Sequence, residues 1–278
     1  MLIGAHVSAA GGVQNAPANA HEFGCECFQF FSRSPQGGVA PKLTPEIVAA
    51  FLDNCKKYNQ REWVIHAPYY INFASDKEFL RKRSAAIIRE ELERGSLLKA
   101  AYLMFHPGSA AVVGRAEGIK LTIEGCRRLL DGYDGHTELL LEISACAGAI
   151  IGDTFEEVAE ILRGVGEKMN VCFDTQHAFG SGYDLRDADA VHDTFSKFDK
   201  LIGLKRLKMS HCNDSKIELG GHKDRHEHIG DGKIGKKGFA EIVAHPKLKH
   251  VNLYCETEYD KVVGDIKIMK KLRDAAAI

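Results

Sequence analysis

Six apolar, strand-like runs of this sequence each end in a histidine or a carboxylate. In chain order, the terminal residues are His66, His106, Glu142, Asp174, His211 and Glu256. His177 follows the fourth of them closely, and a later loop adds Asp224 and His226. Ionisable side chains are rarely buried without partners, because an unpaired buried charge is costly. The pattern therefore predicts a metal-binding or catalytic site rather than unrelated polar residues.

The number and types of these residues indicate which metal they would bind. Five histidines and four carboxylates give nine candidate ligands. One zinc ion takes about four ligands, of which about three come from the protein in a catalytic site. Nine candidates therefore suit two or three zinc ions with a bridging carboxylate. The histidines favour zinc over magnesium, which prefers oxygen, and Mn²⁺ or iron stays open. Such a site would attract and polarise a phosphodiester.

The elements that must position these residues alternate between strand and helix. Segments with helical periodicity separate eight apolar, β-branched runs: Leu2–Val7, Cys27–Phe31, Trp63–Ala67, Tyr102–His106, Glu138–Ile143, Val171–Thr175, Leu204–His211 and Val251–Thr257. Helix starts are expected after Thr44, from Asp76, after Thr154 and from about Asp260. Eight such units predict an α/β fold, a (β/α)8 TIM barrel with the metal site at the C-terminal ends of its strands. An open doubly wound sheet is the alternative, but a G-x-G-x-x-G turn after the first run is absent.

Composition sets the broad class of the protein. The chain has 278 residues, with 37 Lys and Arg against 38 Asp and Glu, which excludes a globally basic nucleic-acid coat. No long apolar run or secretory leader is visible, so we expect a cytoplasmic protein with a single domain over 1–278 and no membrane partner. The eight cysteines include no CxxC pair and read as reduced thiols. We expect Cys172, Cys212 and Cys255 to face the helices, away from the metals.

Several ordered motifs make the chain resemble the endonuclease IV family of apurinic/apyrimidinic endonucleases. The matching stretches are Ile3-Gly-Ala-His-Val-Ser-Ala-Ala-Gly-Gly12, Phe105-His-Pro-Gly-Ser109, Asp174-Thr-Gln-His-Ala-Phe-Gly-Ser-Gly-Tyr-Asp184, His211-Cys-Asn-Asp-Ser-Lys216, Asp224-Arg-His226 with Ile229-Gly-Asp-Gly232, and Glu256-Thr257. They extend from the first residues to the last strand. The resemblance therefore covers essentially the whole chain.

The resemblance implies three zinc ions per chain and a ligand set for each. His66, His106 and Glu142 would bind the first ion, and Glu142 would bridge to a second held by Asp174, His211 and Glu256. The third ion would be bound by His177, Asp224 and His226. Glu142, Glu256 and His106 are the expected catalytic residues.

The resemblance also implies a reaction and a substrate. Hydroxide between the first two ions would attack the phosphate 5′ to an abasic site in double-stranded DNA, and the third ion would help to stabilise the leaving 3′ oxygen. The products would be a 3′-hydroxyl and a 5′-deoxyribose phosphate. Family members also trim blocked 3′ ends in DNA base excision repair. We expect the chain to act as a monomer.

Some positions depart from the family pattern or serve DNA binding. Glu142 is followed by Ile-Ser-Ala-Cys-Ala-Gly148, where the family often has Asn-Thr-Ala-Gly, so the surroundings of that ligand differ. Gln36 aligns where some members insert an arginine into DNA, and Arg33 lies nearby. Tyr69 and Tyr70 follow His66, where the family wedges side chains into the helix, although packing within the loop would explain them equally well. Arg225 completes the expected DNA contacts.

Two other functions compete with the nuclease. A metal-dependent sugar isomerase or epimerase also places Glu, Asp and His at barrel strand ends, but it needs no third metal. His177 and the Asp224-Arg-His226 loop argue against that function. A zinc protein that binds abasic DNA without cutting it would be expected to have lost some of the nine ligands. His6 is not a family ligand, and we expect it to support the site or the structure.

Overall fold

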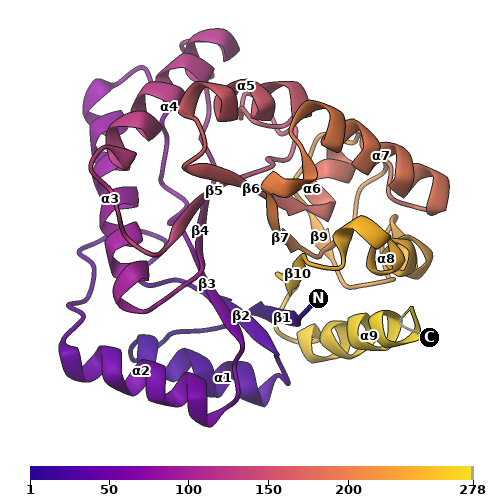
Figure 1. The fold of residues 1–278 in the computed structure, drawn as a ribbon. Coiled ribbons are helices and arrows are strands. Elements are labelled where there is room, and N and C mark those ends of the chain that lie inside the picture. Colours follow the sequence, from indigo (N-terminus) through magenta and orange to yellow (C-terminus); the bar gives the residue numbers. More distant parts are fainter. Residues whose placement is uncertain (277–278) are drawn as a thin grey trace.

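Eight parallel strands close into a barrel in the computed structural model, which describes residues 1–276. The strands are β1 (Ile3–His6), β2 (Cys27–Phe30), β3 (Glu62–His66), β4 (Tyr102–Phe105), β5 (Glu138–Glu142), β6 (Met169–Asp174), β7 (Leu207–His211) and β10 (Asn252–Cys255). They neighbour one another in the order β1-β10-β7-β6-β5-β4-β3-β2, and helices surround them (Figure 1). The TIM-barrel prediction is confirmed, and each strand falls on one of the eight expected runs.

The helices within residues 1–276 include the four whose starts the sequence indicates. They are α1 (Ala16–Glu22), α2 (Pro45–Lys57), α3 (Glu78–Leu97), α4 (Arg115–Leu130), α5 (Phe155–Val165), α6 (Thr175–Gly180), α7 (Ala188–Leu201), α8 (Gly235–Ala244) and α9 (Val262–Ala275). Thr44 and Thr154 cap α2 and α5, where each side-chain oxygen accepts a backbone N–H of the first turn. The helix expected from Asp76 begins two residues later, after Lys77. The last helix begins at Val262.

Side chains fill the barrel interior in layers, because alternate residues of a strand face the same side. The buried inner layer consists of Cys27, Val64, Met104, Leu140, Cys172, Met209 and Tyr254. The prediction that Cys172 faces the helices is therefore wrong, since it lies two residues before Asp174 and shares its side. Cys212 and Cys255 do pack in the outer core, as expected. Gly4 has the equivalent place in β1, where a Cβ atom would lie 1.6 Å from the Cys27 carbonyl oxygen.

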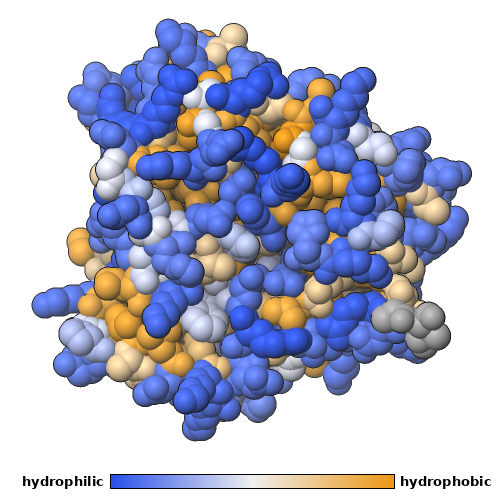
Figure 2. Space-filling model, in the orientation of Figure 1, coloured by the Kyte–Doolittle hydropathy of each residue, from blue (hydrophilic) through white to orange (hydrophobic). Residues whose placement is uncertain are grey.

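The long segment after β7 contains a small hairpin that the sequence did not indicate. Strands β8 (Asp214–Ser215) and β9 (His226–Glu227) pair antiparallel, which fixes His226 against the end of the barrel. None of the helices within residues 1–276 combines the length and the apolar run that crossing a bilayer takes. Polar side chains cover most of the face shown in Figure 2, and an apolar patch lies at its lower left, on the side of α2.

Candidate metal centre

The predicted ligands form the layer directly above the inner apolar layer. Each strand-end ligand lies two residues after one of those apolar residues, so both point into the barrel. Glu142, Asp174 and His211 are fully buried, and His66 is 3% exposed. The barrel thus brings together side chains that are up to 190 residues apart in sequence, as between His66 and Glu256.

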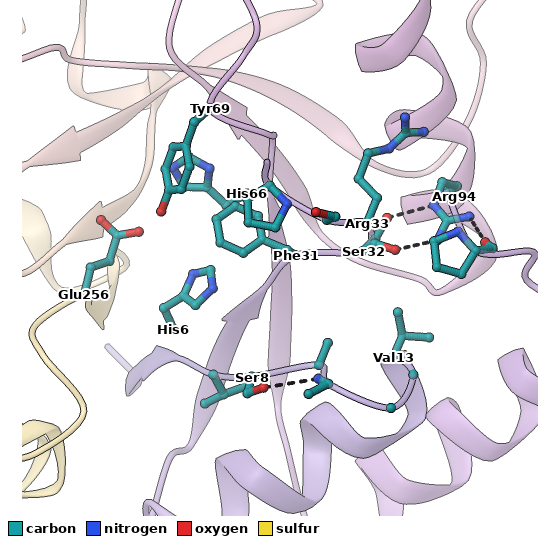
Figure 3. A pocket seen from close by; sticks show the side chains of 18 of the residues that line it. His6, Ser8, Val13, Phe31, Ser32, Arg33, His66, Tyr69, Arg94 and Glu256 are labelled. Carbon is teal, nitrogen blue, oxygen red and sulfur yellow. Dashed lines mark hydrogen bonds between the residues drawn. The ribbon is translucent and has the colours of Figure 1, made fainter. Parts of the chain in front are cut away.

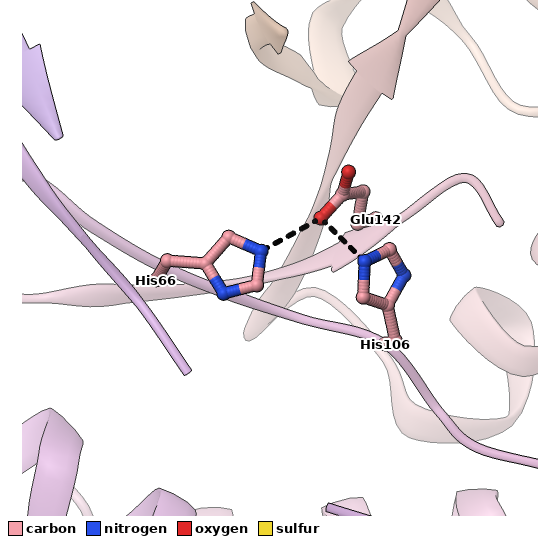
Figure 4. A group of neighbouring side chains, drawn as sticks. All are labelled: His66, His106 and Glu142. Atoms are coloured by element: carbon pink, nitrogen blue, oxygen red, sulfur yellow. Dashed lines mark ion pairs between the residues drawn. The ribbon is translucent and has the colours of Figure 1, made fainter. Parts of the chain in front are cut away.

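The first group combines the ends of β3, β4 and β5. His66 Nε2 and His106 Nε2 lie 3.4 and 3.3 Å from the same atom, Glu142 Oε2 (Figure 4). Two ligand atoms about 2.1 Å from one tetrahedral zinc ion lie about 3.4 Å from each other. The spacing therefore suits a shared ion.

The second group uses the other oxygen of Glu142. His211 Nδ1 lies 2.8 Å from Glu142 Oε1, 3.2 Å from Glu256 Oε2 and 3.8 Å from Asp174 Oδ2. These four residues place one ligand atom each within 4.8 Å of one another. Glu142 consequently belongs to two groups at once, one through each oxygen, which is the geometry that a bridging carboxylate needs.

The third group lies where α6 and the hairpin meet. His177 Nε2 is 3.5 Å from Asp224 Oδ2, and His226 Nε2 is 3.3 Å from Asp224 Oδ1. Asp174 Oδ2 also lies 3.8 Å from His226 Nε2, so Asp174, His177 and His226 can surround one ion as well. Asp224 reaches the two histidines with different oxygens from the exposed side, since 55% of its side chain is accessible.

Three of the candidate ligand atoms are buried without a hydrogen-bond partner among the described residues. They are Glu142 Oε2, His177 Nε2 and His226 Nε2. A buried polar atom left unpaired costs about 1 to 3 kcal/mol, and more when the group is charged. Cations in the first and third groups would satisfy all three atoms, so the chain's own residues fit metal ions there.

The opposite ring nitrogens are held by other groups, which fixes the orientation of the rings. Backbone carbonyls of Ala67, Ile143 and Glu256 lie 2.6, 2.9 and 3.4 Å from Nδ1 of His66, His177 and His226. These contacts leave each Nε2 free for a metal. At Ile143 the backbone carbonyl makes the contact, so the contact uses no atom of the Ile143 side chain.

Electrostatics within the groups favours the charged forms of Glu142 and His177, whereas burial lowers the pKa of His106. Burial opposes ionisation of Glu142, but the charges of His106 and His211 outweigh it and hold its pKa well below the usual value. Burial likewise opposes protonation of His177, and the nearby carboxylates of Asp174, Asp224 and Glu142 raise its pKa well above the ordinary value. Without metal, protons on histidines therefore balance part of the carboxylate charge.

Two amides that support the ligands were not named as site residues from the sequence. Asn213 donates to Asp174 Oδ2 at 2.7 Å, and its oxygen accepts the Glu256 backbone N–H at 2.8 Å. Gln29 in β2 accepts from His211 and donates to Glu256. Asn213 lies in the motif beginning at His211. Gln29 is the inward position two residues after Cys27, a signal that the spacing already contained.

A cavity of about 750 Å³ opens above these groups. Six of the nine candidate ligands line it: His66, His106, His177, Asp224, His226 and Glu256. Tyr69 also lines it, with 68% of the residue exposed and its ring 5.7 Å from that of His66 (Figure 3). Tyr70 lies outside the lining, half-buried, with Arg83 above its ring at 6.0 Å.

The other expected DNA contacts, Arg33, Gln36 and Arg225, differ in their exposure and in their position relative to the cavity. Arg33 is buried, and its guanidinium pairs with Glu90 and with Glu91, the latter at 2.7 Å. Its side chain therefore fastens the loop after β2 to α3 at the wall of the same cavity. Gln36 and Arg225 are exposed and lie outside the cavity lining.

Known proteins are similar to this chain in both sequence and fold. The family model described as a xylose isomerase-like TIM barrel matches residues 17–277. The "Probable endonuclease 4" of Halothermothrix orenii is 38% identical across 98% of this chain and 99% of its own length. The crystal structure of endonuclease IV from Thermus thermophilus superposes with a TM-score of 0.89, at 31% identity, over 99% of this chain and all of the other. A D-tagatose 3-epimerase-like protein (TM-score 0.74, 20% identity, 100% of this chain and 98% of the other) shares the fold alone.

Proposed function

The chain belongs to the endonuclease IV family of enzymes, and on this basis we propose that it is a zinc-dependent apurinic/apyrimidinic endonuclease of DNA base excision repair. It hydrolyses the phosphodiester 5′ to an abasic site in double-stranded DNA, leaving a 3′-hydroxyl and a 5′-deoxyribose phosphate. It also trims blocked 3′ ends. It acts as a cytoplasmic monomer, and residues 1–278 form one endonuclease domain.

The observation that carries this proposal is the set of three adjoining ligand groups at the floor of one cavity. Two groups share Glu142, and Asp174 of the second group also lies within 3.8 Å of His226 in the third. The third group favours the nuclease over a sugar epimerase, because an epimerase needs no third metal ion. The buried, unpartnered atoms of Glu142, His177 and His226 support metal ions as their partners.

In this proposal, the nine residues hold three zinc ions in the sets His66–His106–Glu142, Glu142–Asp174–His211–Glu256 and His177–Asp224–His226. Mn²⁺ or iron would also suit one or more of these sets. Zinc so held supplies Lewis acidity, which polarises phosphoryl oxygens and lowers the pKa of water.

The chain's own residues orient the reaction. Glu142, Glu256 and His106 are the proposed catalytic residues, and histidines from β3, from just after β4, from α6 and from β7 surround Glu142. Asn213 donates to the Asp174 carboxylate and accepts the Glu256 backbone N–H, which fixes the two residues relative to each other. Such fixed ligands keep the charge of the site in place while the phosphate reacts.

DNA binding uses the cavity rim and the loops around it. Tyr69 is placed to pack against an extruded deoxyribose or to fill its space in the helix, because its ring is exposed beside His66. Tyr70, Gln36, Arg225 and Arg33 remain proposed contacts. Of these, Arg33 would need to leave its pairs with Glu90 and Glu91 to reach a phosphate.

An incision assay with a charge-neutral substitution tests the proposal. The substrate is an end-labelled duplex with one abasic-site analogue, and the product ends are mapped. Glu256→Gln should keep the fold but lower the rate steeply, because it removes charge from the second ligand set. Glu167→Gln is the control, since Glu167 is exposed and precedes β6, at the end of the barrel opposite the ligands. Cutting by the Glu256→Gln chain at the control rate would contradict the assigned role.

A further inference from the structure

Gln29 is a buried amide whose polar atoms are all used at the metal centre. It is 0% exposed, and its strand-end position puts it in the same layer as the candidate ligands. Its Oε1 lies 2.7 Å from His211 Nε2. Its Nε2 lies 2.5 Å from Glu256 Oε1 and 2.9 Å from His6 Nδ1.

The neighbours of Gln29 determine which end of the amide is oxygen. His211 directs Nδ1 toward Glu142, Glu256 and Asp174, so its Nε2 carries the proton and needs an acceptor. The Glu256 carboxylate needs a donor. Both requirements place the amide oxygen against His211 and the amide nitrogen against Glu256. The second N–H of Gln29 then points at His6.

This assignment fixes the tautomer of His6. Its Nδ1 accepts the Gln29 N–H and is therefore unprotonated, so the proton of the neutral ring is on Nε2. No group within residues 1–276 forms a hydrogen bond with His6 Nε2.

The His6 ring is held at the wall of the cavity. Strands β1 and β2 pair so that His6 and Gln29 are direct neighbours. The ring packs at 4.5 Å against that of Phe31 and at 6.5 Å, edge-on, from that of His66. Figure 3 shows it between Glu256 and Phe31, and His6 is part of the cavity lining. A fixed N–H donor thus stands beside the candidate ligands without belonging to any of their three groups.

We propose that His6 is an additional substrate-binding residue, whose Nε2–H donates a hydrogen bond to an oxygen of the abasic deoxyribose phosphate in the cavity. Gln29 is the positioning residue that sets the His6 ring and links it to His211 and Glu256. The inference rests on the proposed endonuclease function. It adds a hydrogen-bond donor from β1, a strand that supplies no metal ligand.

The test measures DNA binding and metal content as well as cutting. The probe is a duplex with a tetrahydrofuran abasic analogue whose scissile bridging oxygen is replaced by methylene, so that it binds without being cut. His6→Phe keeps the ring volume and removes the donor, and His6→Gln restores an N–H near the same place. His136→Phe, at an exposed histidine, is the control. Wild-type cutting of the cleavable duplex establishes separately whether the proposed function holds.

We expect His6→Phe to raise Kd about 10- to 100-fold, the range for losing a hydrogen bond to a charged acceptor. The number of metal ions per chain should stay at the wild-type value, and His6→Gln should recover most of the affinity. Gln29→Leu should lower both DNA affinity and metal content, because it also releases His211 and Glu256.

Two results would overturn the inference. In one, His6→Phe binds the probe as tightly as wild type. In the other, it loses metal together with affinity, which would make its role structural. A natural abasic duplex with the same methylene replacement distinguishes the acceptor atoms. An equal loss on both duplexes supports a phosphate oxygen, and a larger loss on the natural lesion supports its 1′-hydroxyl, which tetrahydrofuran lacks.

Discussion

Asp214 offers the sharpest test of how the fold positions the third ligand group. Its buried carboxylate accepts backbone N–H groups of Ser215, Ile234 and Gly235 at Oδ1, and of Gly230, Gly232 and Gly235 at Oδ2. These contacts close the segment that carries Asp224 and His226. Asp214→Asn keeps the shape of the side chain but turns one acceptor oxygen into a donor.

The cost follows from the number of donors left unpaired. Whichever way the new amide turns, at least two backbone N–H groups face an NH₂ group instead of an oxygen. Each buried, unsatisfied donor costs about 1 to 3 kcal/mol, which gives a loss of about 2 to 6 kcal/mol in the free energy of unfolding. At roughly 2 to 4 °C per kcal/mol, Tm should fall by roughly 4 to 24 °C.

Thermal denaturation and metal counting on the same samples measure both consequences. Asp231→Asn is the matched control, because Asp231 lies in the same segment, has 59% of its side chain exposed and approaches Lys261 only at 4.0 Å. We expect Asp214→Asn to lose stability and metal from the third group, and the control to lose neither. If the two variants had the same Tm and full metal content, the proposed role of Asp214 would be refuted.

Three further predictions concern pH, salt and the cavity rim. In the metal-free chain, neighbouring acids raise the pKa of His177 and His211 well above the ordinary value against the effect of burial. The stabilisation that these two protonated histidines give the metal-free chain is complete below about pH 6.5 and is lost as pH rises through their raised pKa values. The increase in Tm on adding zinc should therefore grow from pH 7 to 9, and an increase that stays constant would contradict this. The logarithm of DNA affinity should fall with log salt by a modest slope of about −3, because Lys216 and Lys233 already pair with Glu258 and Glu218, and a slope near zero would exclude a basic DNA-binding patch. Tyr69→Ala should weaken binding of abasic duplex about 5- to 100-fold without lowering Tm. Phe79→Ala, at a similarly exposed aromatic residue on α3, should leave both the affinity and Tm unchanged.

The sequence was sufficient to predict the barrel and the clustering of the strand-end side chains, because both follow from short-range regularities, whereas the division into three ligand sets came from the family resemblance. Strands repeat every two residues, so an apolar residue followed two positions later by His66, His106 or Glu142 indicates an inward-facing polar layer. Parallel strands in a barrel then bring their C-terminal ends to one rim. No long-range information was needed to expect these side chains near one another.

The spacing of residue types along the sequence could not predict contacts between distant segments. Arg33 stands in a loop and looked free for DNA, but its partners Glu90 and Glu91 lie on α3, more than 50 residues away. Gln29 meets His211 and Glu256 only because closure of the barrel places β2, β7 and β10 around one site. Cys172 was misplaced for a different reason, since the two-residue repeat puts it on the side of Asp174.

Metal content and incision measured on one preparation test the central claim most directly. The substrate is a duplex with one abasic-site analogue, cut with and without a strong chelator. The account predicts close to three zinc ions per chain and cutting 5′ to the lesion that the chelator abolishes. One or two metal ions with no cutting would contradict it, and ketoses would be the next substrates to try.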